Sequence, residues 1–370
     1  MKTKAAVLWG VNEPWSVEEV ELGDPVAGEV RVKLAASGLC HSDEHLVTGD
    51  LPVPFPVVGG HEGAGVVEAV GPGVASVKEG DHVVLGFIPS CGKCVACSTG
   101  HTNLCDLGAG ILGGPSIADG TFRVKARGQD TCTMCLLGTF SPYVVVHEHS
   151  VIKIEDDLPL DKAALVGCGV TTGFGSAVYA AEVAPGDTVV VVGCGGIGSN
   201  AIQGARIAGA ERIIAVDPSE SRREAAQVFG ATHTAASVEE AAPLVTELTW
   251  GRMANKVILT AGVVTGDLIA PSLALTQKLG RVVVTGLAPF AQMDVQLSLL
   301  DLTLYEKELR GSLFGSANPR ADIPKLLDLY RHGQLMLDEL VTTTYALEDI
   351  NQGYKDMRSH KNTRGMIVYD

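Results

Sequence analysis

The sequence is poor in aromatic and in charged side chains. Phe, Trp and Tyr make up 5% of its 370 residues and Asp, Glu, Lys and Arg 19%, against 46% hydrophobic residues. A chain this apolar is not intrinsically disordered, and its length is enough for two domains. Lys and Arg form no cluster, and the net charge is −15. We therefore exclude nucleic acid and an anionic membrane surface as partners, although an anionic cofactor needs only one or two well-placed cations.

The sequence also lacks a secretion signal and a convincing membrane span. Its first apolar run is brief, ends before Glu13 and Pro14, and has no small-residue cleavage site. Two uncharged windows, 163–181 and 188–205, are long enough to cross a membrane, but their glycine, threonine and asparagine content argues against it. The nine cysteines do not indicate a disulfide framework, which is typical of short secreted chains. We expect a cytoplasmic protein.

Glycine, in contrast, is abundant, with 44 residues, and it separates short apolar runs. Up to about residue 160 these runs predict an all-β barrel or sandwich with long functional loops. The expected strands are Val30–Leu34, Gly65–Val70, His82–Gly86, Tyr143–Val146 and Val151–Ile154.

From about residue 185, apolar strands alternate with helices, which predicts a doubly wound parallel sheet. The expected strands are Thr188–Val192, Arg212–Val216, Lys256–Thr260 and Arg281–Thr285, and the expected helices are Ser199–Ile207 and Ser221–Phe229. For the C-terminal part we expect helices at Ile323–His332 and Leu347–Arg358 and a final strand at Met366–Tyr369.

A glycine-rich turn joins the first strand of this sheet to its first helix. The pattern G-x-G-x-x-G is weak by itself in a chain so rich in glycine, but here it follows a strand, opens a helix and precedes a second strand that ends at Asp217. Its glycines permit a tight turn, close approach to a pyrophosphate and close helix packing, and the helix N-terminus attracts phosphate. The residues expected to bind a dinucleotide are Gly193, Gly195, Gly196, Ile197 and Gly198.

Asp217 indicates which dinucleotide binds. Its carboxylate would accept hydrogen bonds from the adenosine ribose hydroxyls and repel a 2′-phosphate, which favours NAD over NADP. The alternative, that Asp217 only caps the next helix, is weaker with the whole unit in place. Arg222 and Arg223 offer cations for a 2′-phosphate, but both fit a solvated helix face. We therefore predict NAD(H) as the cofactor, with Arg222 among the residues near it.

Four cysteines lie within fifteen residues and predict a structural zinc site, because thiolates at this spacing can close a tetrahedral coordination sphere completely. The four ligands would be Cys91, Cys94, Cys97 and Cys105. An iron–sulfur cluster uses similar spacing, but nothing nearby indicates electron transfer, and a nucleic-acid-binding zinc ribbon conflicts with the acidity of the chain. A further pair, Cys132 and Cys135, has no redox-fold context, and we interpret it as buried or incidental.

The stretch around His61 resembles a known zinc signature. The sequence G-H-E-x2-G-x5-G-x2-V, which begins at Gly60, resembles that of the medium-chain, zinc-dependent alcohol dehydrogenases, and Cys40, the four-cysteine loop, Cys168 and the glycine turn follow in that family's order. The resemblance implies that Cys40, His61 and Cys168 hold a catalytic zinc whose fourth position is left for water or substrate. Any one of the three alone would be interpreted as a core residue. We expect two zinc ions per chain.

The resemblance covers essentially the whole chain and implies its fold and chemistry. The fold class would be α/β, with a GroES-like β-barrel catalytic domain formed by residues 1–169 and 313–370, which carries the structural-zinc loop, and a Rossmann NAD-binding domain formed by residues 170–312. The implied reaction is oxidation of an alcohol to an aldehyde or ketone, in which zinc favours the alkoxide and hydride passes to C4 of the nicotinamide.

Residues beside the first zinc cysteine match the family's proton relay. By this resemblance Ser42 takes the alcohol proton and passes it through the nicotinamide ribose to His45 and solvent, although a surface role is the plain alternative for Ser42. Asp43 matches the carboxylate that orients the histidine ligand. Glu62 matches an acid behind the metal. Glu44 is interpreted as a surface residue.

Other positions match the family's cofactor and substrate contacts. His41 stands where a cation for the pyrophosphate is usual, and Arg364 matches a tail arginine that reaches the same group, with a surface role as its alternative. Thr172 matches a residue that packs against the nicotinamide. Phe87 and Leu136 are candidates for the apolar wall of the substrate pocket.

Within the family, segments 86–91, 137–143 and 167–173 look most like the bacterial nicotinoprotein branch, which is assayed with N,N-dimethyl-4-nitrosoaniline and holds NAD permanently while another acceptor reoxidises it. A thiol-dependent formaldehyde dehydrogenase is the nearest alternative enzyme; His41 would suit it, whereas His45 favours simple alcohols. A non-catalytic binding or structural member is the alternative of another class, which the intact ligand set disfavours. We expect a small-molecule alcohol or aldehyde substrate, a redox partner for bound NADH, and a homo-oligomer formed through the Rossmann sheet.

Overall fold

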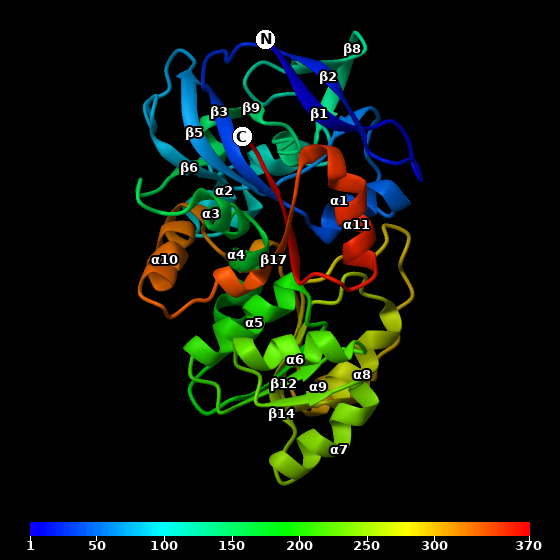
Figure 1. Ribbon diagram of the computed structural model, residues 1–370. Coiled ribbons are helices and arrows are strands. Elements are labelled where there is room, and N and C mark those ends of the chain that lie inside the picture. Colours follow the sequence, from blue (N-terminus) through cyan, green and yellow to red (C-terminus); the bar gives the residue numbers. More distant parts are fainter. The chain divides into compact units, whose positions relative to one another are not determined.

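The computed structural model describes all 370 residues, and its contacts divide the chain into two compact units (Figure 1). Unit 1 contains Met1–Cys168 and Asn318–Asp370, and unit 2 contains Gly169–Ala317. Unit 1 is therefore built from both ends of the sequence, and unit 2 from one continuous segment.

Unit 1 contains a small closed barrel. The end of its second strand alternates exposed glutamates with buried apolar residues, as expected for a strand with one face on a core, whereas the last four residues of its first strand are all buried. Its strands, in order around the barrel, are β1 (Lys2–Leu8), β2 (Ser16–Leu22), β7 (Val124–Ala126), β8 (Gln129–Thr133) and β4 (Val57–Val58). The side chains of Val7, Val20, Leu22 and Val58 are at most 3% exposed and form the barrel interior.

A larger, mostly antiparallel sheet forms the rest of the β structure of unit 1. Its order is β10 (Val151–Lys153), β6 (His82–Leu85), β5 (Gly63–Val70), β3 (Glu29–Gly38), β18 (Arg364–Val368) and β17 (Val341–Tyr345), and β9 (Tyr143–His147) also pairs with β3. Because β18 runs antiparallel to β3 with Met366 opposite Gly38, the C-terminal tail reaches the end of β3, next to the start of the first helix.

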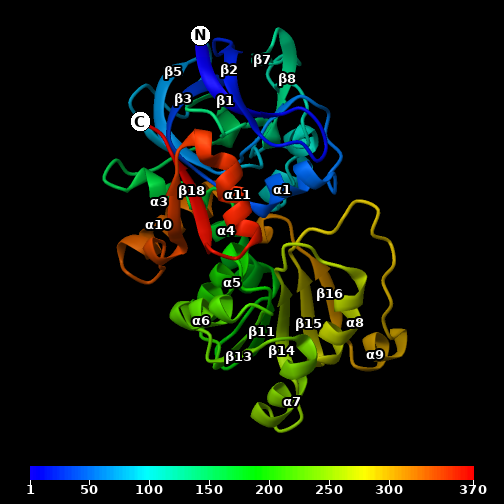
Figure 2. The same cartoon turned by 45° about the vertical axis from the view of Figure 1, so that its right-hand side comes forward.

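Helices complete unit 1, and two of them correct the expectation of an all-β first part. They are α1 (His41–Thr48), α2 (Val95–Ser98), α3 (Leu160–Val166), α10 (Pro319–Arg331) and α11 (Ile350–Arg358). Helices α1 and α2 lie inside that part and were missed because each is under three turns long. Helix α3, which begins where that part ends, was also missed. Figures 1 and 2 show α11 beside α1, and the Tyr354 hydroxyl of α11 donates to the carbonyl oxygen of Cys40 at 3.4 Å.

Unit 2 is a six-stranded parallel sheet of the Rossmann type, as the sequence predicted. Its order is β13 (His233–Ala235), β12 (Arg212–Val216), β11 (Thr188–Val192), β14 (Ala254–Leu259), β15 (Thr276–Val284) and β16 (Glu308–Gly311), with β16 at one edge (Figure 2). Every residue of β11 is buried, which fits a central strand covered on both faces.

The helices of unit 2 are α4 (Gly169–Gly175), α5 (Gly196–Ile207), α6 (Glu220–Phe229), α7 (Val238–Leu248), α8 (Ile269–Ala274) and α9 (Leu299–Leu304), with a π-helical turn at Ser176–Ala180. Helix α5 begins three residues before the predicted Ser199, because the glycine turn itself supplies its first residues. No single helix is long and apolar enough to cross a membrane, although the bent pair Leu160–Val166 and Gly169–Ala180 passes by length and composition alone.

Candidate active site

The four-cysteine loop brings its sulfur atoms together within one short segment. Cys91 and Cys97 have sulfurs 3.9 Å apart, and Cys94 and Cys105 have sulfurs 4.0 Å apart. Four thiolates around one zinc at about 2.3 Å lie about 3.8 Å from one another, so both separations fit a tetrahedral ion. No sulfur is left over, and the sphere they form is closed.

Backbone amides support these sulfurs. The amides of Cys94 and Cys97 each donate to the sulfur of the preceding cysteine at 3.4 Å, and the amide of Cys91 donates to the sulfur of Cys105 at 3.4 Å. Such bonds favour the thiolate. The amide of Lys93 leads in lowering the pKa of Cys91 to about 6, whereas burial raises the pKa of Cys105 to about 12. The thiolate is thus favoured at Cys91 and Cys94, whereas burial raises the pKa of Cys97 and Cys105.

A second donor cluster forms inside unit 1 from residues far apart in sequence. Candidate ligand atoms of Cys40, His61, Glu62 and Cys168 all lie within 4.8 Å of one another, and all four residues are buried. Cys40 precedes α1, the two middle residues lie in the turn before β5, and Cys168 follows α3. Gly60 has φ +86, and a Cβ there would collide with Phe140, so the turn that delivers His61 requires glycine.

Asp43 orients the histidine of this cluster. Its Oδ1 accepts the Gly60 amide at 2.7 Å, which fixes the carboxylate, and its Oδ2 lies 3.1 Å from His61 Nδ1. Nε2 is therefore the ring nitrogen left for a metal. Burial opposes charge on the ring, but the negative charges of Asp43 and Cys40 outweigh it and hold the pKa of His61 well above its usual range. In the absence of a metal, a hydrogen bond from Cys168 holds the pKa of Cys40 well below its usual range.

Glu62 and Arg364 form a buried ion pair behind the two sulfurs. Arg364 is 6% exposed, so the alternative of a surface role for it is wrong. Burial raises the pKa of Glu62 in spite of the guanidinium. The carboxylate oxygen Oε1 and the guanidinium Nε have no hydrogen-bond partner. A Cβ at Gly38 would overlap Glu62 Oε2, so this packing depends on glycine at the end of β3.

Helix α1 presents the predicted relay residues. The Ser42 hydroxyl oxygen lies 3.6 Å from the Cys40 sulfur, which places it beside the donor cluster. His45 is buried, and its Nδ1 lies 2.9 Å from Oδ2 of Asp50. The ring of His41 meets that of His45 edge-on, with centroids 5.1 Å apart. Asp50 was missed from the sequence, because the family motif stops short of it.

Glu44 corrects one of our expectations. It is 6% exposed rather than on the surface, and its carboxylate accepts a hydrogen bond from Arg358 of α11 at 2.6 Å. The pair ties α1 to a helix from the other end of the chain. Only the tertiary fold brings these two residues together.

In unit 2 the glycine turn has the geometry that a pyrophosphate needs. Gly193 has φ +93, and a Cβ on Gly198 would overlap its carbonyl oxygen, so both positions require glycine. A Cβ on Gly195 would meet nothing within 4 Å, which leaves the N-terminus of α5 open. Gly196 and Ile197 form the first turn of α5, where unpaired N–H groups face outward.

The carboxylate of Asp217 accepts hydrogen bonds from the glycine turn and from the start of the next helix. Its Oδ2 accepts the amide of Cys194 at 2.8 Å, and its Oδ1 accepts the amide of Ser219 at 2.9 Å. Arg222 Nη1 lies 3.9 Å from Oδ2, and Arg223 donates to the carbonyl oxygen of Asp217 at 2.7 Å. Both arginine side chains therefore contact Asp217, which directly follows β12.

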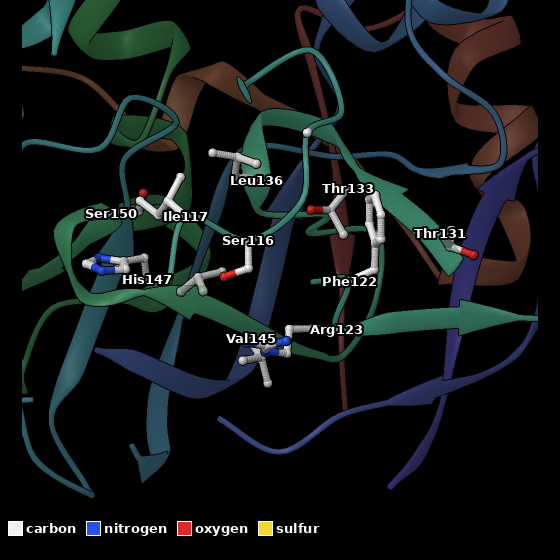
Figure 3. A pocket seen from close by; sticks show the side chains of 12 residues that line it. Ser116, Ile117, Phe122, Arg123, Thr131, Thr133, Leu136, Val145, His147 and Ser150 are labelled. Atoms are coloured by element: carbon white, nitrogen blue, oxygen red, sulfur yellow. The ribbon is translucent and has the colours of Figure 1, made fainter. Parts of the chain in front are cut away.

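The remaining predicted residues lie in three different places. Phe87 packs its ring edge-on to His61, with centroids 5.9 Å apart. Thr172 is buried in α4, and its hydroxyl has no hydrogen-bond partner. Leu136 lines a cavity of about 30 Å³ in unit 1, shared with Ser116, Phe122 and other residues (Figure 3). That volume suits a water molecule rather than a substrate.

The two remaining cysteines of unit 1 are buried thiols. Cys132 is 6% exposed and Cys135 4% exposed, and neither forms a disulfide. Burial raises the pKa of Cys135 to about 12, which keeps it protonated and unreactive.

Known proteins match this chain over nearly its whole length. Residues 26–156 match the family described as alcohol dehydrogenase GroES-like domain, and residues 196–332 match zinc-binding dehydrogenase. Alcohol dehydrogenase B of Mycobacterium tuberculosis is 54% identical over 100% of this chain and 99% of its own length. The NDMA-dependent alcohol dehydrogenase of Amycolatopsis methanolica is also 54% identical, with the same coverage.

Solved structures resemble the whole chain. An alcohol dehydrogenase zinc-binding domain protein from Burkholderia ambifaria has a TM-score of 0.93 at 32% identity and covers 100% of this chain and 99% of its own. Benzyl alcohol dehydrogenase from Acinetobacter calcoaceticus has a TM-score of 0.93 at 31% identity, with 100% of both chains covered.

Proposed function

This chain belongs to the zinc-dependent alcohol dehydrogenases of the medium-chain superfamily, and from that premise we propose that it oxidises a small-molecule alcohol to an aldehyde or ketone with NAD as hydride acceptor. The observation that carries the proposal is the buried cluster of Cys40, His61 and Cys168 with the Ser42 hydroxyl beside it. Two sulfurs and one imidazole leave a position for substrate, as a catalytic zinc site requires.

The donor chemistry of both clusters fits zinc. The loop of Cys91, Cys94, Cys97 and Cys105 offers a closed set of four sulfurs, which suits a structural ion. When bound in the buried cluster, zinc supplies Lewis-acid chemistry that lowers the pKa of an alcohol hydroxyl. Glu62 is the fourth candidate donor of that cluster, and we propose that it adjusts the site from behind while Arg364 balances its charge.

The chain's own residues orient the histidine ligand, transfer the substrate proton and line the substrate pocket. Asp43 orients His61 through Nδ1 and raises its basicity. Ser42 accepts the proton that leaves the substrate hydroxyl and passes it through the nicotinamide ribose to His45, which carries it toward solvent. Phe87, against the ring of His61, forms part of the apolar wall of the substrate pocket, and Leu136 is the weaker candidate because it lines another cavity.

Unit 2 holds the cofactor in this proposal. The N-terminus of α5, from Gly195, receives the pyrophosphate, and the carboxylate of Asp217 favours NAD over NADP. Thr172 packs against the nicotinamide. His41 and Arg364 stay candidates for the pyrophosphate, and Arg222 for the adenosine side. The domain boundaries 1–169, 170–312 and 313–370 also stay part of the proposal.

We place the enzyme in the nicotinoprotein branch, and the 54% identity to an NDMA-dependent alcohol dehydrogenase supports this. In that case NAD(H) stays bound and a redox partner reoxidises it. Denaturing the purified protein should release close to one NAD(H) per chain, and turnover should need nitrosoaniline rather than added NAD. Protein that is free of cofactor and turns over with free NAD would contradict the branch but not the family.

Metal analysis and substrate tests address the alternatives. Two zinc ions per chain with alcohol oxidation would support the proposal, whereas a single zinc with no turnover of any alcohol would favour a non-catalytic member. Formaldehyde oxidation that depends on an added thiol would favour the thiol-dependent class.

A cytoplasmic location is consistent with nine free thiols, because thiols persist in a reducing compartment.

We also propose a homo-oligomer that is formed through unit 2. Strand β16 lies at one edge of the sheet, and the segment before it exposes a run of apolar side chains. These are Phe290, Met293, Leu299, Leu300 and Leu304, with exposed fractions from 65% to 84%. An uncovered edge strand with such neighbours favours a second copy that extends the sheet. Light scattering that gives the mass of a single chain would contradict this.

A further inference from the structure

The histidine of α1 has a carboxylate partner outside the family motif. His45 has a side chain that is 2% exposed, and its Nδ1 lies 2.9 Å from Oδ2 of Asp50. Helix α1 ends at Thr48, and Gly49 takes the left-handed conformation, with φ 80, which turns the chain back toward the helix. The amide of Leu51 then donates to the carbonyl oxygen of His45 at 3.2 Å and closes the turn. Two backbone features thus hold Asp50 against the ring.

The carboxylate of Asp50 is held in place and ionised. The Thr48 hydroxyl donates to the same Oδ2 at 2.7 Å, and the Asp50 side chain is 27% exposed. Hydrogen bonds from Thr48 and from His45 lower the pKa of Asp50 below its usual range. An ionised carboxylate can only accept hydrogen bonds, so Nδ1 of His45 must carry its hydrogen.

A second histidine, His41, also faces this ring. Its ring meets that of His45 edge-on at 5.1 Å. The imidazole of His45 is therefore held by Asp50 from one end and packed against His41, inside a site where its side chain is almost fully buried. A ring whose Nδ1 carries the hydrogen has its lone pair on Nε2.

We propose that Asp50 is a positioning residue of the proton relay, fixing His45 in the tautomer that keeps the Nε2 lone pair available; this rests on the function proposed above. The proton lost by the substrate hydroxyl passes by way of Ser42 and the nicotinamide ribose to Nε2. The ring then carries a positive charge, which the Asp50 carboxylate stabilises. Nε2 releases the proton to solvent, and the ring returns to its starting tautomer.

The competing interpretation is that Asp50 only closes the turn after α1 through Thr48. Two variants separate these roles. Asp50→Asn keeps the size of the side chain, but its amide can donate to Nδ1 and so move the ring hydrogen to Nε2. Thr48→Val removes the hydroxyl bond and leaves the contact between Asp50 and His45. Asp24→Asn is the matched control, because Asp24 is an 87% exposed carboxylate that pairs with Arg31.

We expect Asp50→Asn to lower kcat roughly tenfold. A positioned acid or base raises a reaction rate about 10²–10⁴-fold, and only part of that gain should be lost because His45 itself remains. The KM values for alcohol, the zinc content and the thermal midpoint should stay as in the parent enzyme. Adding a small amine base should restore part of the lost rate in this variant alone, because external base bypasses a misaligned relay. Thr48→Val, which loosens the Asp50 carboxylate but leaves it beside His45, should lower kcat less than Asp50→Asn does, and Asp24→Asn should keep the parent kcat.

A spectrum of the ring gives a readout independent of turnover. In protein labelled with ¹⁵N-histidine, His45, assigned by its loss in His45→Gln, should show a protonated Nδ1 in the parent and a protonated Nε2 in Asp50→Asn. Parent kcat without any response to amine base in Asp50→Asn would overturn the proposal, and so would an unchanged tautomer. If the parent itself oxidises no alcohol, the proposed function fails.

Discussion

The two donor clusters of unit 1 show how differently one chain can build a metal site. The four donors of the loop come from residues 91 to 105 and are supported by their own backbone amides. The four donors of the buried cluster come from residues 40 to 168 and depend on β3, α1 and the tail of the chain. The loop is a local structure, and the buried cluster is a product of the tertiary fold.

Their surroundings differ in the same way. Around the loop, Lys93 and Val95 are exposed, and water can screen its charges. Around the buried cluster, Asp43, Glu62 and Arg364 are buried together, so each charge must be balanced by a neighbour. A closed, screened set of thiolates suits a structural ion, whereas a buried set with an open position suits chemistry. The predictions below test this division of roles.

The largest effect should follow from breaking the buried cluster. Cys168→Ser replaces a soft thiolate donor while keeping the size of the side chain. We expect turnover to fall roughly a thousandfold, because a catalytic metal contributes several kcal/mol and each tenfold is about 1.4 kcal/mol. The thermal midpoint should change little. Steady-state kinetics with zinc analysis and calorimetry on the same sample will check both. A large loss of stability with turnover retained would reverse the assignment.

The matched change in the loop should have the opposite signature. Cys94→Ser opens the closed sphere, and we expect the loop zinc to be lost. The thermal midpoint should fall by about 5 °C, since losing a metal site costs several kcal/mol and each kcal/mol shifts the midpoint of a 370-residue chain by about 1.3 °C. Below the new midpoint, turnover should stay within about threefold of the parent, because the chemistry lies elsewhere. Calorimetry and one remaining zinc per chain are the measurements.

Two glycine-to-alanine substitutions separate the cost of a packing clash from the cost of an unfavourable backbone conformation. Gly38→Ala puts a methyl group against Glu62 and should cost about 2–3 kcal/mol by overpacking, with reduced turnover. Gly100→Ala, after the loop helix, has open space but φ +88 and should cost about 1 kcal/mol with turnover unchanged. Denaturant unfolding of both variants measures the two costs. Equal costs with equal turnover would mean that Glu62 and its arginine can move aside freely.

The contrast between local and tertiary sites also explains what could be predicted from the sequence. The loop was predicted from the spacing of its cysteines alone, and the glycine turn from its spacing together with the strand before it and the helix after it. The buried cluster came from family resemblance, because nothing in the residues themselves brings Cys40 to Cys168. Glu44 was wrongly placed on the surface, since its partner Arg358 lies 314 positions away. Asp50 was missed because its role depends on the left-handed turn at Gly49.

The smallest expected effect is a pH dependence of stability that arises at His149, which contacts the start of the four-cysteine loop. The carbonyl oxygen of His149 accepts the amide of Ser90, next to Cys91, and its Nδ1 lies 3.2 Å from Arg320 Nη2, a contact that suits a neutral ring. Burial first, then the nearby charges of His147 and Arg320, lowers the pKa of His149. A lowered folded-state pKa means stability that is present above the unfolded value near 6.5 and is lost as pH falls below it.

We therefore expect the thermal midpoint of the parent protein to fall between pH 7 and pH 5. In His149→Gln the fall should be smaller, because glutamine can still accept from Arg320 but takes up no proton. Zinc content across the same pH range shows whether the loop ion is released together with this loss. If the loop were as independent of its surroundings as its spacing suggests, parent and variant would lose zinc at the same pH, and only their midpoints would differ.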